Sequence, residues 1–110
     1  MVDFIMIDTC PFYTGYRPDS PAPDGHVYDF TEAAGFNVNN WEAQLQSQLL
    51  EFEKRLQEST APFRVVIGHH PIRSYGSHRD TNEMLGNVDY LIWKYGVHLY
   101  MNGHDHNLQH

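Results

Sequence analysis

The sequence predicts an α/β fold with about three largely parallel strands and two helices. Two observations lead to this prediction. Short apolar runs alternate with segments of helical periodicity, in the order strand, loop, helix, strand, helix, strand. Two of the apolar runs also lead directly into histidine-rich segments. Such alternation is typical of right-handed crossovers that place the strands in a parallel sheet.

Length and composition restrict the class of protein. A chain of 110 residues fits one small domain or a piece of a larger one, and its 41% hydrophobic and 14% aromatic residues are enough for a core. The formal charge of -7 argues against a nucleic-acid-binding surface, which would need a basic face. No apolar stretch approaches the roughly 20 residues of a membrane span, and no signal peptide is visible. Cys10 is the only cysteine, which excludes an internal disulfide and a Cys-rich zinc site.

Three strands are predicted from short apolar runs. Residues 2–7 (VDFIMI) open the chain with such a run, residues 63–67 (FRVVI) have the pattern of a buried strand, and residues 97–101 (VHLYM) form the third. Pro62 stops any helix before the second run. Residues 11–40 hold four prolines and three glycines, and we expect them to form a long surface loop.

Two helices are predicted from apolar residues at helical spacing. The first covers residues 41–56, where Asn39 and Glu42 make a capping box. The second covers residues 82–95, and Gly96 stands at the position of a C-terminal cap. The apolar stripe of the first helix is Trp41, Leu45, Leu49, Phe52 and Leu56, and that of the second is Met84, Leu85, Val88, Leu91, Ile92 and Tyr95.

Histidines gather at the ends of two predicted strands. The second strand runs into GHHP (residues 68–71), and the third runs into NGHDH (residues 102–106). In a parallel sheet the carboxyl ends of the strands share one edge, and ligands bind there. Because neighbouring strands lie about 4.8 Å apart, the imidazoles of both segments can meet at one centre or at a close pair of centres.

Three of these histidines, His69, His104 and His106, are candidate metal ligands. Neutral imidazole suits zinc, iron, manganese and similar ions, but three histidines are too few for a pair of metals. Asp105 or backbone carbonyls are candidates for holding the far ring nitrogens, and His70 fits a structural or supporting role better than that of a ligand. The alternative is that the three candidates are ordinary loop histidines.

Other polar and aromatic residues near this edge have no single interpretation. Asp8 ends the first predicted strand and therefore shares the edge, but the sequence does not define its role. Tyr13, Tyr16 and Tyr28 lie in the predicted long loop. They either form a rim around a substrate or belong to a loop that packs over the sheet.

The motifs GHHPI and GHDHNLQ, with RSYGSHRDT between them, resemble the last two metal-binding blocks of the calcineurin-like metallophosphoesterases. The resemblance is closest to the purple acid phosphatases of the tartrate-resistant type. It implies that His69 and His104 bind one metal and that His106 binds the other. It further implies that His78, nine residues after His69, faces the substrate phosphate and stabilises the transition state or protonates the leaving alkoxide. The alternative is that His78 is a solvated loop residue.

The resemblance carries expectations for the parent protein. Its fold would be an α/β/β/α sandwich of two sheets flanked by helices, of which this chain supplies one part. It would be an acid phosphatase that hydrolyses phosphate monoesters with a binuclear metal centre, in which iron is paired with iron, zinc or manganese. Members of the family are mostly secreted, lysosomal or vacuolar, so the resemblance implies the same location here.

The early motifs of the family do not occur in this chain. These are an Asp-containing strand end, Gly-Asp-x-x-Tyr and Gly-Asn-His-Glu/Asp, and the match places Asp8 at a later strand than the bridging aspartate. Residues 1–110 are therefore interpreted as a fragment that holds the late blocks and needs the missing N-terminal half for a full site, so the isolated chain is expected to be inactive. Two alternatives remain: a metallophosphoesterase that hydrolyses phosphodiesters or nucleotides, or a non-catalytic metal-binding module.

Overall fold

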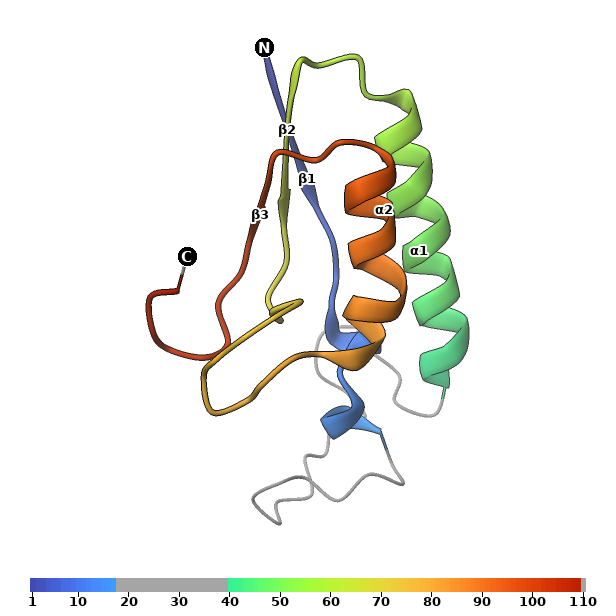
Figure 1. Cartoon of the computed structure of the whole chain (residues 1–110). Coiled ribbons are helices and arrows are strands. Elements are labelled where there is room, and N and C mark those ends of the chain that lie inside the picture. The colour runs from blue at the N-terminus through green and yellow to red at the C-terminus, as the bar shows by residue number, and fades with distance from the viewer. Residues whose placement is uncertain (18–39, 110) are drawn as a thin grey trace.

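The computed structural model describes residues 1–17 and 40–109, and its centre is a three-stranded parallel sheet (Figure 1). The strands are β1 (Val2–Met6), β2 (Phe63–Ile67) and β3 (Leu99–Met101), in the order β1-β2-β3. Both strand pairs are parallel, so the carboxyl ends of all three strands lie at one edge. The predicted α/β fold with three parallel strands and two helices is confirmed.

The first helix, α1 (Trp41–Glu58), continues two residues beyond its predicted end at residue 56. Its apolar stripe faces the sheet, and Leu45, Phe52 and Leu56 are buried. Asn40 occupies the N-cap position without a side-chain cap hydrogen bond. The predicted capping residue Asn39 lies outside the described residues.

The second predicted helix, residues 82–95, is divided into two kinds of turn. A π-helical segment η4 (Met84–Val88) precedes the α-helix α2 (Asp89–Lys94). The side chain of Asn87 donates a 2.8 Å hydrogen bond to the backbone carbonyl of Glu83. A side chain that binds a helical carbonyl competes with the regular backbone ladder, which accounts for the wider turn at this point.

Gly96 ends α2 as the sequence predicts. It has a φ of +60°, and the amides of Gly96 and Val97 donate to the carbonyls of Trp93 and Ile92. This pattern is the Schellman motif, in which the left-handed residue is usually glycine because it has no Cβ.

Alanine at Gly96 is therefore expected to lower the free energy of unfolding by about 1 kcal/mol. Gly86 is the matched control, since a Cβ at either glycine meets nothing within 4 Å and only Gly96 has a positive φ. Gly86→Ala should leave stability unchanged or raise it by up to about 1 kcal/mol. Urea unfolding of both variants measures the difference, and equal effects would contradict the assignment of the cost to the backbone conformation.

The core lies between one face of the sheet and the two helices. Ile5 of β1 and Val66 of β2 point into it and belong to the same buried cluster as Phe52, Leu56 and Leu91. The opposite face of the sheet carries apolar side chains that the described part of the chain leaves exposed. Among the described residues, neither helix has the length and apolar character needed to cross a bilayer.

The expectation of a surface loop at residues 11–40 is wrong for its beginning. Two short 3₁₀ turns, η1 (Cys10–Phe12) and η2 (Thr14–Tyr16), follow β1, and Pro11 and Phe12 are buried. Phe12 joins the hydrophobic core, which a count of prolines and glycines does not reveal. Residues 18–39 lie outside the part of the chain that the structure describes.

Candidate metal centre

The two histidine-bearing loops leave the sheet side by side. The amide of Gly68, after β2, donates to the carbonyl of Met101 at 3.0 Å, and the amide of Gly103, after β3, donates to the carbonyl of His69 at 3.1 Å. Backbone pairing thus continues past the last residues of both strands. This pairing brings the side chains that follow the two strands to one place.

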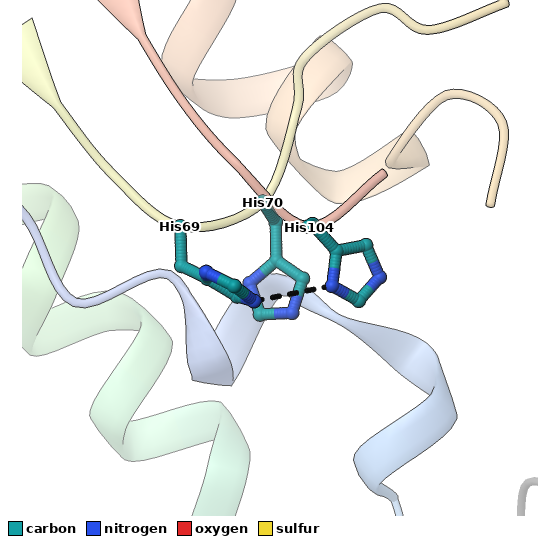
Figure 2. Close-up of side chains that lie close together, drawn as sticks. All are labelled: His69, His70 and His104. Atoms are coloured by element: carbon teal, nitrogen blue, oxygen red, sulfur yellow. Dashed lines mark hydrogen bonds between the residues drawn. The ribbon is translucent and has the colours of Figure 1, made fainter. Parts of the chain in front are cut away.

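Three imidazoles meet at this edge. Nε2 of His69 and Nδ1 of His104 are 3.2 Å apart. One nitrogen from each of His69, His70 and His104 can be chosen so that all three lie within 4.8 Å of one another, and Figure 2 shows these rings gathered near the blue helical turns that follow β1. Residues 35 positions apart in the sequence are therefore within reach of one ion.

The hydroxyl of Thr9 holds the turn that carries His69 and His70. Its Oγ1 accepts the amide N–H of His69 at 3.2 Å and that of His70 at 3.0 Å, and it lies 2.8 Å from Nδ1 of His70. Tyr100 donates its hydroxyl to the carbonyl of His70 at 2.6 Å. One threonine side chain in the turn after β1 therefore fixes the backbone after β2, a role that no motif of the sequence indicates.

His70 is fully buried and already has partners for both ring nitrogens. With two amides donating to Thr9 Oγ1, the hydroxyl proton is available for Nδ1, and Nε2 lies 3.3 Å from the hydroxyl of Tyr16. Burial, followed by repulsion from three neighbouring histidines, lowers the pKa of His70 from 6.5 to about 3. A neutral imidazole with a hydrogen-bond partner at each ring nitrogen matches the structural role that the sequence indicates.

The lowered pKa of His70 predicts a pH-dependent stability. Between its ordinary pKa of 6.5 and about 3, the unfolded chain binds a proton at this position and the folded chain does not. The contribution of His70 to the free energy of unfolding should therefore be constant above about pH 6.5 and fall by up to about 1.4 kcal/mol per unit below it.

Urea unfolding at a series of pH values measures this slope. In His70→Gln, whose amide can still bind Thr9, the slope between about pH 6.5 and pH 4 should be smaller, because glutamine does not titrate. A wild-type stability that does not change over this interval would contradict the prediction.

His104 has the properties of a metal ligand. Burial is the main reason that its pKa is lowered from 6.5 to about 4, followed by repulsion from His78 and His69. Its Nε2 is buried and has no hydrogen-bond partner among the described residues. An imidazole that is neutral in mild acid and turns its Nδ1 toward another imidazole fits a transition-metal ion.

The loop that carries His104 holds two strained residues. His104 has a φ of +72° and His106 has a φ of +50°, in the left-handed region that residues other than glycine seldom occupy. Such conformations cost on the order of 1–3 kcal/mol each and cluster at binding sites. His106 is exposed and contributes to the lowered pKa of His104, but it lies outside the group of three converging nitrogens.

His78 lies at the margin of this cluster. Its ring centroid is 4.1 Å from that of His104, although the residue comes from the loop after β2 and is exposed. Its backbone N–H donates to Asp105 Oδ1 at 2.9 Å. The structure thus brings His78 next to the candidate ligand His104, while His106, in the loop after β3, is exposed.

Asp105 braces the two loops against each other. Its carboxylate accepts the hydroxyl of Ser74 and the amide of His78, and a Cβ at Gly76 would collide with it. The hydrogen bond with Ser74 is the main cause of a lowered pKa of Asp105. This differs from the expectation that Asp105 holds a ring nitrogen, because the carboxylate bonds to the 74–78 loop instead.

Removal of this carboxylate should loosen the loop around His78. In Asp105→Ala, we expect the His78 amide to exchange its hydrogen about tenfold faster or more, since a charge-assisted hydrogen bond of roughly 1.5–3 kcal/mol is lost. Hydrogen-exchange NMR measures the exchange rate of the His78 amide in both proteins. Asp89→Ala is the control, because Asp89 pairs with Arg73 through a largely exposed contact and bonds no loop amide. Unchanged protection of His78 in Asp105→Ala would show that Asp105 does not brace the loop.

The remaining residues predicted near the edge have defined places. The carboxylate of Asp8 accepts the amide of Cys10 at 3.0 Å and so supports the turn that follows β1. Tyr13 stacks on His70 at 4.7 Å between ring centroids and meets His104 edge-on at 5.1 Å. The aromatic residues thus pack against the histidines, and Tyr28 lies outside the described residues.

Comparison with curated proteins identifies relatives of the whole chain. Purple acid phosphatase 17 and purple acid phosphatase 3 of Arabidopsis thaliana are each 37% identical over 110 residues, which is all of this chain and 30% and 28% of those proteins. Tartrate-resistant acid phosphatase type 5 of Oryctolagus cuniculus is 32% identical over 94 residues, or 86% of this chain and 29% of that protein. No protein-family model matches. The chain thus spans less than a third of the length of these relatives, and it belongs to the purple acid phosphatase family.

Proposed function

We propose that this chain carries the late metal-binding part of an acid phosphatase site that hydrolyses phosphate monoesters. The observation that supports this most is the 3.2 Å approach of His69 and His104 from the ends of two parallel strands. The phosphatase names of the relatives support the same reaction class. Residues 1–110 are then one part of a longer phosphatase domain.

The donor set fits a metal centre of this family. His69 and His104 would hold one ion and His106 a second, with iron paired with iron, zinc or manganese. His104 turns its Nδ1 toward Nε2 of His69 at 3.2 Å, so one ion could bind both nitrogens. Bound metal ions supply positive charge that polarises a phosphoryl group and activates water. Because the chain has a net charge of -7, this local positive charge is what allows a phosphate to approach.

His78 is proposed to face the phosphate. Its ring lies beside His104 and is exposed to solvent, so a substrate bound at the centre would be within its reach. An imidazolium at this position can donate a hydrogen bond to a phosphoryl oxygen and a proton to the leaving alkoxide. Asp105 holds the backbone of His78 in place by accepting a hydrogen bond from its amide N–H.

The isolated chain is proposed to bind metal incompletely and to turn over little or no substrate. Three or four imidazoles do not fill the coordination of two ions, for which carboxylate and other ligands are also needed. The remaining ligands would come from the part of the longer domain that precedes these residues. Secretion, or a lysosomal or vacuolar location, is proposed from the same relationship.

Phosphate binding tests this proposal without requiring turnover. Isothermal titration of the zinc-loaded chain with inorganic phosphate should give heat that the metal-free chain does not give. His78→Asn should weaken the phosphate affinity by about tenfold or more, equivalent to 1.4 kcal/mol, and should leave zinc affinity unchanged. His98→Asn is the control, since His98 lies before β3 at the opposite end of the strand.

Two outcomes would contradict the proposal. One is a zinc-loaded chain with no more affinity for phosphate than the metal-free chain, which would favour a non-catalytic metal-binding module. The other is a longer form of the protein that hydrolyses bis(4-nitrophenyl) phosphate faster than 4-nitrophenyl phosphate, which would favour a phosphodiesterase.

A further inference from the structure

The far ring nitrogen of His104 is held by no hydrogen bond in the described part of the chain. Nδ1 faces Nε2 of His69 at 3.2 Å, where one ion could bind both rings, and Nε2 of His104 is buried without a partner. A metal-bound histidine usually donates its other ring N–H to a carboxylate, a carbonyl or water, and this contact orients the ring. The adjacent carboxylate of Asp105 bonds to Ser74 and to the amide of His78 instead. The orientation of the His104 ring therefore depends on packing.

Aromatic rings pack around His104 from the turns that follow β1 and from the neighbouring loop. The centroid of Tyr13 lies 5.1 Å from that of His104, with the planes at 69°, and the centroid of His70 lies 4.6 Å away. Tyr13 also stacks on His70, with centroids 4.7 Å apart and planes at 15°. Edge-to-face and offset-stacked pairs of this kind attract each other. One tyrosine ring thus contacts both the candidate ligand His104 and the buried histidine beside it.

The turns that carry Tyr13 are anchored on both sides. Phe12, directly before it, is buried in the hydrophobic core. Arg17, directly after η2, pairs with Glu83 at 2.7 Å, and its Cζ lies 3.6 Å from the ring centroid of Trp41. Figure 2 shows these turns, in pale blue, beside the histidine rings. The backbone of Tyr13 is therefore fixed relative to the edge that carries the histidines.

A glycine leaves room for the ring of Tyr13. A Cβ on Gly15 would stand 2.5 Å from Cε1 and 3.1 Å from Cζ of Tyr13, so the ring would have to move. Among the described glycines only Gly96 has a positive φ, so the backbone at position 15 does not itself require glycine. The missing side chain instead allows the tyrosine ring to lie where it meets the two histidines.

We propose that Tyr13 is a positioning residue, whose ring holds His104 in the orientation that presents Nδ1 to an ion shared with His69. This inference rests on the proposed metal centre. A histidine side chain has three staggered wells at χ1 and a roughly two-fold χ2, which gives about six orientations. When packing selects one of them, the ion meets a ligand already in place, whereas a free ring is competent only about one-sixth of the time. Tyr13 thus takes the orienting role that a hydrogen-bonding carboxylate has at other metal sites.

Zinc titrations of variants at position 13 test the proposal. Isothermal titration of Tyr13→Ala should show a zinc affinity about threefold to sixfold weaker than that of the wild type, because the His104 ring is no longer held. Tyr13→Phe keeps the ring and should bind zinc as the wild type does. Tyr90→Ala is the matched control, since Tyr90 is a 62% exposed tyrosine of α2, and it should also keep the wild-type affinity.

A second variant moves the ring without removing it. The methyl group of Gly15→Ala should displace the ring of Tyr13 and weaken zinc affinity by a similar factor. In the Tyr13→Ala background, the same change should have no further effect, because no ring remains to be displaced. Losses that simply add in the double variant would show that the two residues act independently, which would overturn the proposal.

NMR of the metal-free wild-type chain examines the ring contact without zinc and without any substitution. The ring protons of Tyr13 and His104 should give a nuclear Overhauser effect, and His104 should show one set of ring signals. This measurement stays decisive even if Tyr13→Ala does not fold. A missing Overhauser effect between the two rings would overturn the proposal.

The zinc affinity of His104→Asn separates this inference from the metal centre itself. If His104→Asn loses affinity while Tyr13→Ala and Gly15→Ala do not, the centre stands and Tyr13 does not position its ligand. If His104→Asn also binds zinc like the wild type, the proposed centre fails and the role of Tyr13 fails with it. A loss in Tyr13→Phe as large as that in Tyr13→Ala would assign the effect to the hydroxyl and contradict a role for the ring.

Discussion

Replacement of His104 by alanine is expected to lower the zinc affinity of the chain on the order of 100-fold or more. Even residues that only orient a ligand change metal affinity by about 10- to 100-fold, and His104 offers the nitrogen that lies nearest to His69. Its lowered pKa, about 4, keeps the ring neutral in mild acid, so its loss matters down to that pH. Isothermal titration with zinc at about pH 6.5 measures the effect.

Two further variants separate ligation from folding. His104 has a φ of +72°, which asparagine tolerates better than alanine, so His104→Asn should keep the loop and still lose affinity. His98→Ala removes an exposed histidine at the other end of β3 and should bind zinc like the wild type. Wild-type affinity in both His104 variants would mean that the ion, if bound, lies elsewhere.

Replacement of Thr9 by valine should cost about 2–5 kcal/mol in the free energy of unfolding. Valine has the shape of threonine but no hydroxyl. The change leaves the amides of His69 and His70 and Nδ1 of His70 without the partner that they share. The site is buried, so water does not replace the lost bonds without cost. Urea or thermal unfolding measures the loss.

One control for this prediction changes Thr9 itself, and the other changes Thr14 in η2. Thr9→Ser keeps the hydroxyl and loses one methyl group, which should cost about 1 kcal/mol. Thr14→Val changes an exposed threonine of η2 and should have an effect within about 0.5 kcal/mol. If Thr9→Ser is as destabilising as Thr9→Val, packing of the side chain matters more than its hydrogen bonds.

Much of the fold could be predicted because its signals are local. The runs at 2–7, 63–67 and 97–101 contain all three observed strands, and the helical stripe at 41–56 contains most of α1. Alternation of strands and helices also predicted correctly that the strands are parallel. The π-helical turn at Met84–Val88 was not predictable, because it depends on a contact between Asn87 and one carbonyl.

The candidate centre was predictable in part for the same reason. Glycine and histidine directly after two strands placed His69 and His104 at one edge, where the structure has them. No sequence pattern marked Thr9 as part of the site, because a single threonine after a strand is common. The three groups that it bonds are about 60 residues away in the chain. The bracing role of Asp105 likewise depends on a loop that comes from another strand.

The uncovered side of the sheet shows another limit of sequence patterns. Both faces of the strands are largely apolar, so the sequence indicates burial on both sides but does not say what covers each side. The helices cover one face, where buried side chains of α1 and α2 join the same core cluster as Ile5 and Val66. Only the arrangement in space shows that the face with Phe4 and Met101 has no cover from the described residues.

The most direct test of the central claim is an NMR titration of the histidine ring nitrogens with zinc. The claim is that His69 and His104, from separate strand ends, hold one ion together. We predict that the ring nitrogens of both residues shift at the same zinc concentration and saturate together, while those of His98 do not move. Ring signals of His69 and His104 that stay in place, or that respond at different zinc concentrations, would contradict it.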